Sequence, residues 1–173
     1  MTRSFLKWAG GKHKVADTLL KIIEKHQPHG IQWGVNVGQR YHEPMLGSGS
    51  MYFKLKSNGL INSRKKSFLS DINSIIISTM KVVSSEKNLE KLILQLNDLQ
   101  KAYPLDLPHP NPRNQEDEIR EKRMFYKKRR RLNVLSSKID SLTESELIEM
   151  AATAIFLNKT CFNGLWRMNS KGG

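Results

Sequence analysis

The sequence predicts an α/β fold in which a short strand–turn–helix–strand unit is followed by a mainly helical part. A glycine-containing turn at 43–50 leads into a helix that begins at Met51 and ends near Asn58-Gly59. Residues 67–70 are then predicted to form a short buried strand that ends at Asp71. From residue 74 onwards, apolar residues recur mainly at the spacing of helices.

The segment before the glycine turn supplies the first elements. Residues 13–28 are predicted to form a helix, because apolar residues recur there at helical spacing and Pro28 stands at the end. These apolar positions are Val15, Leu19, Leu20, Ile22 and Ile23. Residues 30–41 are polar and contain glycine, so a loop or a weak strand is expected there.

The later part of the chain is predicted to be helical. The expected helices span 74–83, 88–102, 115–134 and 144–158. The second carries one apolar face, made by Leu89, Leu92, Ile93, Leu96 and Leu99. The last follows Thr143-Glu144-Ser145-Glu146, a typical helix start. Prolines break the pattern at Pro104, Pro108, Pro110 and Pro112. We therefore expect a loop or linker over 103–114, and a loop or the start of a hairpin over 159–173.

Composition limits the kind of protein. The 173 residues carry 29 Lys and Arg against 16 Asp and Glu, which gives a net charge of +13 and a pI near 10.0. This excess favours a polyanionic partner, most simply nucleic acid, although a basic surface without a partner is the alternative. The single cysteine, Cys161, excludes an internal disulfide and a cysteine zinc cluster and fits a reducing cytosol. No membrane-spanning run and no signal peptide are expected.

The glycine turn and the acid after the second strand together indicate a nucleotide site. Gly47-Ser48-Gly49 alone is more typical of a plain tight turn. With Asp71 following at about the distance of nucleotide-binding folds, the nucleotide interpretation is favoured, because glycines let the backbone approach a ligand and the acid accepts ribose hydroxyls. Tyr52 stands where a third glycine would fall, which argues against a dinucleotide.

The segment Phe5-Leu6-Lys7-Trp8-Ala9-Gly10-Gly11-Lys12 is a second glycine-containing motif. Alone it fits either a phosphate-binding loop or an ordinary turn. It lacks the upstream glycine of a Walker loop, and His13 replaces the Ser or Thr that would hold magnesium. Together with the glycine turn and Asp71, it predicts a pocket for an adenosyl cofactor that has no pyrophosphate.

Four motifs in this order resemble the DNA adenine-N6 methyltransferases of the Dam type. They are FLKWAGGK, EPMLGSGS, SDIN and FLNKTCFNGLWRMNSKGG, and the resemblance covers most of 1–100 and 145–173. It implies a Rossmann-like catalytic domain that binds S-adenosylmethionine and an inserted, mainly helical target-recognition domain that binds duplex DNA. The expected division is 1–102 for the catalytic part, 103–114 for a proline-rich loop and 115–173 for the recognition sub-domain.

The resemblance assigns cofactor-binding roles to Trp8, Lys12, Glu43, Gly47, Gly49 and Asp71. Trp8 would supply an apolar face, and Lys12 would lie near the methionine carboxylate or hold its segment in place. Glu43 begins the turn whose glycines would approach the methionine part, and Asp71 would bind the ribose. Core packing for Trp8 and a solvated position for Lys12 are the alternatives. Met45 stands where the family usually has Phe.

The late motif resembles the family's DNA-reading hairpin. The resemblance assigns DNA contacts to Phe162, Asn163, Leu165 and Arg167. Phe162 would stack on or wedge between bases, Asn163 would contact a phosphate or base edge, Leu165 a thymine methyl, and Arg167 a guanine. Alternatively, the apolar residues cap the preceding helix. The basic run 127–131 fits backbone phosphates or, alternatively, a solvated helical face.

The family's catalytic tetrapeptide, Asp-Pro-Pro-Tyr or a close variant, does not occur in these residues. We therefore expect no catalytic residue here, no metal and no methyl transfer by these residues alone. The parent reaction would convert adenine in DNA to N6-methyladenine. Three hypotheses follow, namely a fragment of an ordinary methyltransferase, one part of a split enzyme completed by a second chain, and a non-enzymatic DNA-binding remnant. A cytoplasmic protein encoded by a prokaryote or a phage, restriction-linked or not, is expected.

Overall fold

A computed structural model describes residues 4–8, 11–12, 15–25, 40–61, 66–103 and 115–161 of the chain. The chain forms two compact units, Met1–Asn73 and Ser74–Gly173. The boundary predicted near residue 102 separates a catalytic part from a recognition part, whereas the boundary between these two units is defined by packing. Within them, the helices over 74–102 belong with the second unit.

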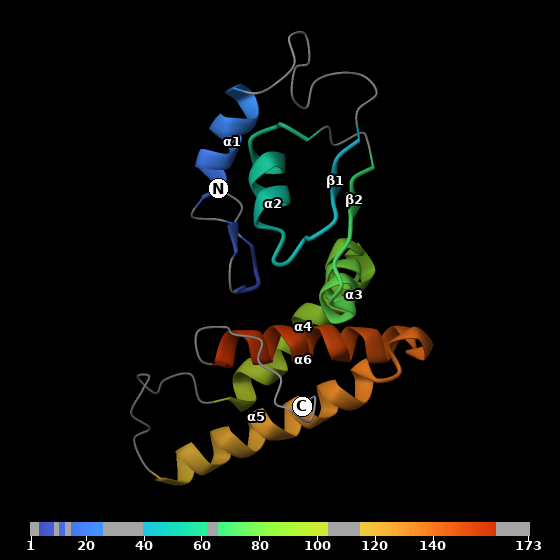
Figure 1. Cartoon of the computed structure of the whole chain (residues 1–173). Helices are drawn as coiled ribbons and strands as arrows, with labels where there is room; N and C mark the ends of the chain where they lie inside the picture. Colours follow the sequence, from blue (N-terminus) through green and yellow to red (C-terminus); the bar gives the residue numbers. More distant parts are fainter. Residues whose placement is uncertain are drawn as a thin grey trace. The chain divides into compact units, whose positions relative to one another are not determined.

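The first unit contains the predicted strand–turn–helix–strand order, but the prediction that the second strand is buried is wrong, since Phe68 is 43% exposed and Leu69 is only half-buried. The elements of this unit are α1 (Ala16–Lys25), β1 (His42–Glu43), α2 (Ser50–Ser57) and β2 (Phe68–Leu69) (Figure 1). The two strands pair in parallel, with His42 opposite Phe68 and Glu43 opposite Leu69. Parallel strands need a crossover between them, and α2 lies in that connection. The strand at 42–43 follows directly after the segment expected to be a loop or weak strand, most of which lies outside the described residues.

A small apolar core holds α1 against α2. Its buried members are Ala16, Leu20, Met51, Leu55 and Ile61, with Leu19, Tyr41, Tyr52 and Leu60 packed at its edge. Leu55 is only 1% exposed, so it occupies the centre of this cluster. An ion pair of 2.7 Å between Lys54 and Asp17 joins the same helices. The core thereby anchors α2, whose first residues follow the glycine turn.

The second unit is a helical bundle. It comprises α3 (Ser74–Ser84), α4 (Glu86–Ala102), α5 (Gln115–Ser136), the 3₁₀-helix η2 (Ile139–Ser141) and α6 (Glu144–Thr160). Figure 1 shows α5 and α6 as a helical hairpin, and η2 lies between these two helices in the chain. Residues 150–158 of α6 are all buried, because α6 packs against α3, α4 and α5. A helix that is apolar on every side takes a central position in this way.

The start of α6 is secured by a capping box, as the sequence indicates. The Thr143 hydroxyl accepts a hydrogen bond from the Glu146 backbone N–H, and the Glu146 side chain accepts one from the Thr143 backbone N–H. Lys138 donates to the Glu146 carboxylate at 2.6 Å. These hydrogen bonds, led by the one from Lys138, lower the pKa of Glu146 to about 2. These bonds therefore favour the ionised form of Glu146 at the first turn of α6.

The predicted helices are confirmed with small shifts at their ends. The first spans Ala16–Lys25, the rest of its predicted range apart from Val15 lying outside the described residues, and the last continues to Thr160. The sequence did not indicate η2. The described residues show an α/β unit with a two-stranded parallel sheet and a separate helical unit. A complete Rossmann-like core with an inserted recognition domain stays a prediction.

Candidate functional site

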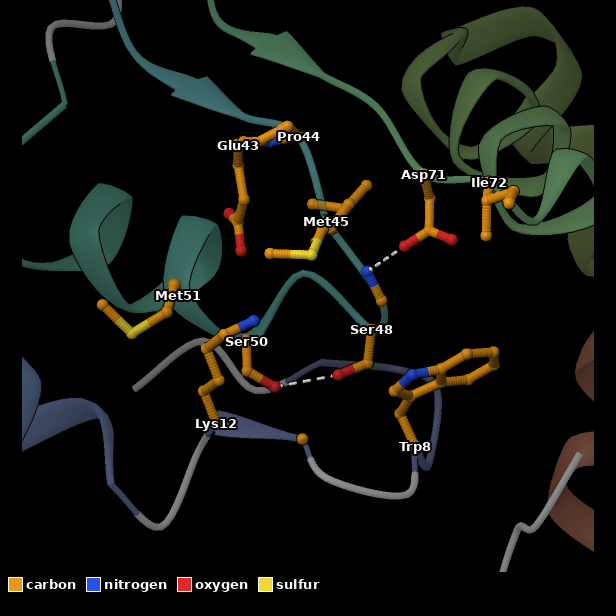
Figure 2. A pocket seen from close by; sticks show the side chains of 13 residues that line it. Trp8, Lys12, Glu43, Pro44, Met45, Ser48, Ser50, Met51, Asp71 and Ile72 are labelled. Atoms are coloured by element: carbon orange, nitrogen blue, oxygen red, sulfur yellow. Dashed lines mark hydrogen bonds between the residues drawn. The ribbon is translucent and has the colours of Figure 1, made fainter.

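A cavity of about 500 Å³ lies in the first unit, where the N-terminal segment, the glycine turn and the end of β2 meet (Figure 2). Its lining residues are Trp8, Gly11, Lys12, Glu43, Pro44, Met45, Leu46, Gly47, Ser48, Ser50, Met51, Asp71 and Ile72. The structure thus brings together the predicted cofactor residues Trp8, Lys12, Glu43, Gly47 and Asp71. The remaining one, Gly49, is buried at the N-cap of α2. Their roles in binding stay predictions.

The glycine turn has a backbone shape that depends on glycine. Gly47 and Gly49 have φ angles of 52° and 72°, in the left-handed region where side chains other than glycine are strained. At Gly47 an added Cβ would lie 3.1 Å from the indole of Trp8, and at Gly49 it would lie 3.0 Å from the ring of Phe53. The Trp8 indole therefore lies directly against the bare backbone of the turn, at the wall of the cavity.

Asp71 joins the end of β2 to this turn. One carboxylate oxygen accepts the backbone N–H of Gly47 at 2.7 Å (Figure 2). The other accepts the backbone N–H of Asn73 at 2.9 Å. The backbone N–H of Leu46 adds a bond of 3.0 Å to the carbonyl oxygen of Ser70. Each carboxylate oxygen has two acceptor positions, so Asp71 keeps acceptor capacity for a ligand after these bonds.

Glu43 and Lys12 line the end of the cavity that lies away from Trp8 and Asp71 (Figure 2). Glu43 is buried, with 8% of its surface exposed. Its carboxylate accepts the Tyr41 hydroxyl at 2.8 Å and the backbone N–H of Tyr52. Burial raises the pKa of Glu43, while the bond from Tyr41, the charge of Lys12 and the bond from Tyr52 act in the opposite direction. A carboxylate and an ammonium group thus share one end of the site.

The sequence analysis missed Tyr41. Residues two apart in an extended strand point to the same side of it, and Tyr41 stands two residues before Glu43. The Tyr41 carbonyl also accepts the backbone N–H of Phe68 at 2.8 Å, which extends the pairing of β1 and β2 by one residue. Tyr41 could therefore have been predicted from the sequence, because its side chain carries a hydroxyl and lies on the same face of the strand as the acid Glu43.

Serine contacts attach the N-terminal segment to the turn, and these were also missed. The Ser4 hydroxyl donates to the Ser48 carbonyl at 2.5 Å, and the hydroxyls of Ser48 and Ser50 lie 2.8 Å apart. Phe5 packs edge-on against Phe53 of α2, with ring centroids 6.4 Å apart. These contacts hold the segment that carries Trp8 and Lys12 beside the turn.

A second concave surface lies on α5, in the helical unit. Its lining residues are Lys122, Arg123, Tyr126, Lys127 and Arg130, and its volume is about 450 Å³. Their spacing places them on one face of a helix. Arg129 lies over the ring of Tyr126, 5.2 Å from its centroid. Within the basic run 127–131, Arg131 instead forms hydrogen bonds of 2.5 and 2.8 Å with the two carboxylate oxygens of Glu149 on α6.

The predicted DNA-reading residues Phe162, Asn163, Leu165 and Arg167 lie outside the described residues. In the part that the structure describes, no group of three or more His, Cys, Asp or Glu side chains is placed to hold a metal ion. Among the same residues, no helix has the length and apolar character needed to cross a membrane.

A parallel strand–turn–helix–strand unit with a cavity at the carboxyl ends of its strands is an arrangement that α/β proteins use for ligand sites. The sequence is more specific than this class. Residues 8–173 match the D12 class of N6 adenine-specific DNA methyltransferases. The chain belongs to this family, which confirms the resemblance seen in its four motifs.

Individual relatives agree with this assignment. The chain is 35% identical over 170 residues to the type II methyltransferase M.MjaIII of Methanocaldococcus jannaschii, with 98% of this chain and 50% of the relative covered. It is 29% identical over 171 residues to the DNA adenine methylase of Serratia marcescens, covering 98% of this chain and 46% of the relative. The chain thus spans about half the length of the curated relatives it matches.

Proposed function

We propose that this chain provides the cofactor-binding part, and part of the DNA-binding surface, of a site-specific DNA adenine-N6 methyltransferase that uses S-adenosylmethionine. The observation that carries the proposal is the cavity in the first unit, where Trp8, Gly47 and Asp71 meet at one end and Glu43 and Lys12 at the other (Figure 2). These two ends match the two parts of an adenosyl amino acid.

The end with Asp71 suits the nucleoside. The remaining acceptor positions of Asp71 are available to ribose hydroxyls, and the Trp8 indole offers an apolar wall. Met45 and Ile72 also line the cavity and are 74% and 103% exposed, as expected of apolar side chains that await a flat ligand. The cavity therefore offers an adenosyl group both hydroxyl acceptors and apolar cover.

The end with Glu43 and Lys12 suits the methionine part, which carries an ammonium and a carboxylate. The Glu43 carboxylate is the partner for the ammonium, and Lys12 for the carboxylate. S-adenosylmethionine supplies an activated methyl group, and the residues of this chain bind and orient it. The neighbouring helix start at Ser50 adds backbone N–H groups that favour a negative group.

Binding of the cofactor is the direct test. Calorimetry with the purified chain is expected to detect S-adenosylmethionine and its product S-adenosylhomocysteine. It is expected to detect no binding of NAD, because Tyr52 stands where the third glycine of a dinucleotide-binding turn would fall. Absence of binding by both adenosyl ligands would falsify the proposal. Preferential binding of NAD would contradict it equally.

Transfer of the methyl group is a separate step. The tetrapeptide that holds the target adenine in this family does not occur in these 173 residues, so a test of transfer needs a segment that carries it. We expect no labelled methyl in duplex DNA from residues 1–173 alone, and transfer when a segment carrying the tetrapeptide is supplied. DNA binding with a steep salt dependence but no transfer even then would favour the non-enzymatic remnant.

Duplex DNA is the proposed partner of the helical unit. The basic face of α5 that contains Lys127 and Arg130 suits backbone phosphates, because these contacts need positive charge without base specificity. Base reading is assigned to Phe162, Asn163, Leu165 and Arg167, by the resemblance of their motif to the family's DNA-reading hairpin. Arg167→Ala is expected to relax sequence preference at one base pair, whereas a uniform loss over all sequences would mark Arg167 as a phosphate contact.

A further inference from the structure

We propose that Tyr41 is a positioning residue of the cofactor pocket, whose hydroxyl holds the Glu43 carboxylate ready for the ammonium group of the methionine part. This inference rests on the proposed function and deepens it, because it says how the charged end of the pocket is prepared before a ligand arrives. Tyr41 itself does not line the cavity, whereas Glu43 does.

The Glu43 carboxylate is held from several directions. The Tyr41 hydroxyl donates to it at 2.8 Å, and the backbone N–H of Tyr52 donates from the first turn of α2. Glycine at position 49 is the N-cap of α2 and has no side-chain acceptor to offer. Glu43 therefore serves as the acceptor for this helix start, where a negative charge is also favoured by the helix dipole.

Tyr41 is rigidly placed for this task. Its ring packs against the core at the junction of α1 and α2 and lies 6.1 Å from the ring of Tyr52. Its backbone carbonyl accepts the N–H of Phe68 from β2. The hydroxyl that reaches Glu43 is thus carried by a side chain fixed to both the sheet and the core.

The hydroxyl matters because Glu43 is buried. Burial raises the pKa of a carboxyl group, and a protonated Glu43 would not attract an ammonium group. The described groups that oppose this are the Tyr41 hydroxyl, Lys12 and the Tyr52 backbone N–H. Burial and the bond to Glu43 raise the pKa of Tyr41 itself, so its hydroxyl remains a donor at neutral pH. Removing the Tyr41 hydroxyl leaves the Glu43 carboxylate with one hydrogen-bond donor fewer and raises the pKa of Glu43 further.

The test compares Tyr41→Phe with Tyr52→Phe in the full 173-residue chain. Both variants remove one hydroxyl from neighbouring tyrosines and keep the rings. Tyr52 is a matched control because its hydroxyl contacts Lys56 at 3.4 Å, and because its bond to Glu43 comes from the backbone, which the substitution leaves in place. The affinity for S-adenosylhomocysteine is measured by calorimetry from about pH 5 to about pH 8, the range in which a raised carboxyl pKa is visible.

Tyr41→Phe is expected to bind about tenfold more weakly at neutral pH, the scale of one hydrogen bond to a charged group. Its affinity should also begin to fall at a higher pH than that of the wild type as the solution is acidified. Tyr52→Phe should keep the wild-type affinity and pH profile. Equal affinities and profiles in all three proteins would overturn the inference, as would loss of a cooperative melting transition in Tyr41→Phe alone.

A wild-type chain that binds no adenosyl ligand overturns the proposed function and this inference together. Wild-type binding that Tyr41→Phe leaves unchanged overturns only the inference. A double variant separates a shared role from independent ones, because in the Glu43→Gln background the Tyr41→Phe change should have little further effect on affinity. Additive losses in that cycle would show that Tyr41 acts without Glu43, and so would contradict the inference.

Discussion

The carboxylate of Asp71 accepts the backbone N–H of Gly47 at 2.7 Å, although the two residues are 24 positions apart in the chain. Its other oxygen accepts the N–H of Asn73. The acid after β2 therefore holds the glycine turn at Gly47, the same residue against which the Trp8 indole lies. The glycine turn is held between an aromatic ring and a carboxylate, both of which line the cavity.

Asp71→Ala is expected to weaken adenosyl-ligand binding by about 1–3 kcal/mol, the scale of lost hydrogen bonds to a charged group. Part of this loss reflects the turn, because the N–H of Gly47 also loses its partner. Ser70→Ala is a neighbouring control, because the exposed Ser70 hydroxyl makes only a long contact of 3.4 Å to Pro44 while its backbone bonds remain. Calorimetry that gives the same affinity for Asp71→Ala and wild type would exclude the ribose role.

Gly47→Ala is expected to destabilise the chain and weaken ligand binding, for two separable reasons. A side chain at φ 52° is strained by about 1–2 kcal/mol, and the new Cβ would lie 3.1 Å from the Trp8 indole. Gly59→Ala isolates the first reason, because Gly59 has φ 71° but no atom within 4 Å of a new Cβ. Thermal melting should show a similar loss of stability from backbone strain in both variants. Calorimetry should show a loss of ligand affinity in Gly47→Ala alone.

Elements whose signal is local were predictable from the sequence, and contacts between distant segments were not. The helix at 144–160 is predictable from its capping box and its apolar residues, because both signals lie within a few positions of one another. The bond between Tyr41 and Glu43 leaves a weaker trace, because its partners become adjacent only once the strand forms. The link between Ser4 and Ser48 leaves none, because it spans 44 positions and repeats with no period.

The proline-rich segment illustrates a related limit. The prolines indicate correctly where α4 ends, since proline cannot continue a helix. A break in the helical pattern does not show which hydrophobic core the preceding helices join. α4 contacts α6, and Tyr103 at its end packs edge-on against Phe156 with centroids 5.3 Å apart. These contacts place α4 in the helical unit, although its own sequence carries only an apolar stripe.

Arg130→Ala is expected to weaken binding to duplex DNA and to reduce the salt dependence by about one counterion, because Arg130 lines the basic face of α5. Its neighbour supplies the control. Arg131 is engaged with both carboxylate oxygens of Glu149, so Arg131→Ala should lower the melting temperature while leaving the salt slope unchanged. Fluorescence anisotropy at several salt concentrations measures the slope. Equal slopes for Arg130→Ala and wild type would show that Arg130 makes no contact with the DNA phosphates.

Thr143→Ala is expected to destabilise the helical unit by about 1 kcal/mol, the usual cost of a lost N-cap. The same turn makes stability depend on pH. The pKa of Glu146 is lowered from its ordinary value to about 2, so its ionised form stabilises the fold above the ordinary carboxyl pKa. That contribution is lost as the pH falls towards 2. The pKa values of Glu144 and Glu149 are also lowered, chiefly by hydrogen bonds from Lys91 and Arg131 respectively, and act in the same direction.

Melting followed by circular dichroism across this acidic range should show the loss of stability in the wild type and a smaller loss in Glu146→Gln. The amide oxygen of glutamine can still accept the Thr143 N–H, so this variant removes the charge while keeping that bond. Glu90→Gln, on the exposed surface of α4, is the control and should follow the wild-type curve. An identical acid dependence in Glu146→Gln and wild type would mean that the start of α6 owes its stability to the hydrogen bonds alone, because the charge would then contribute nothing.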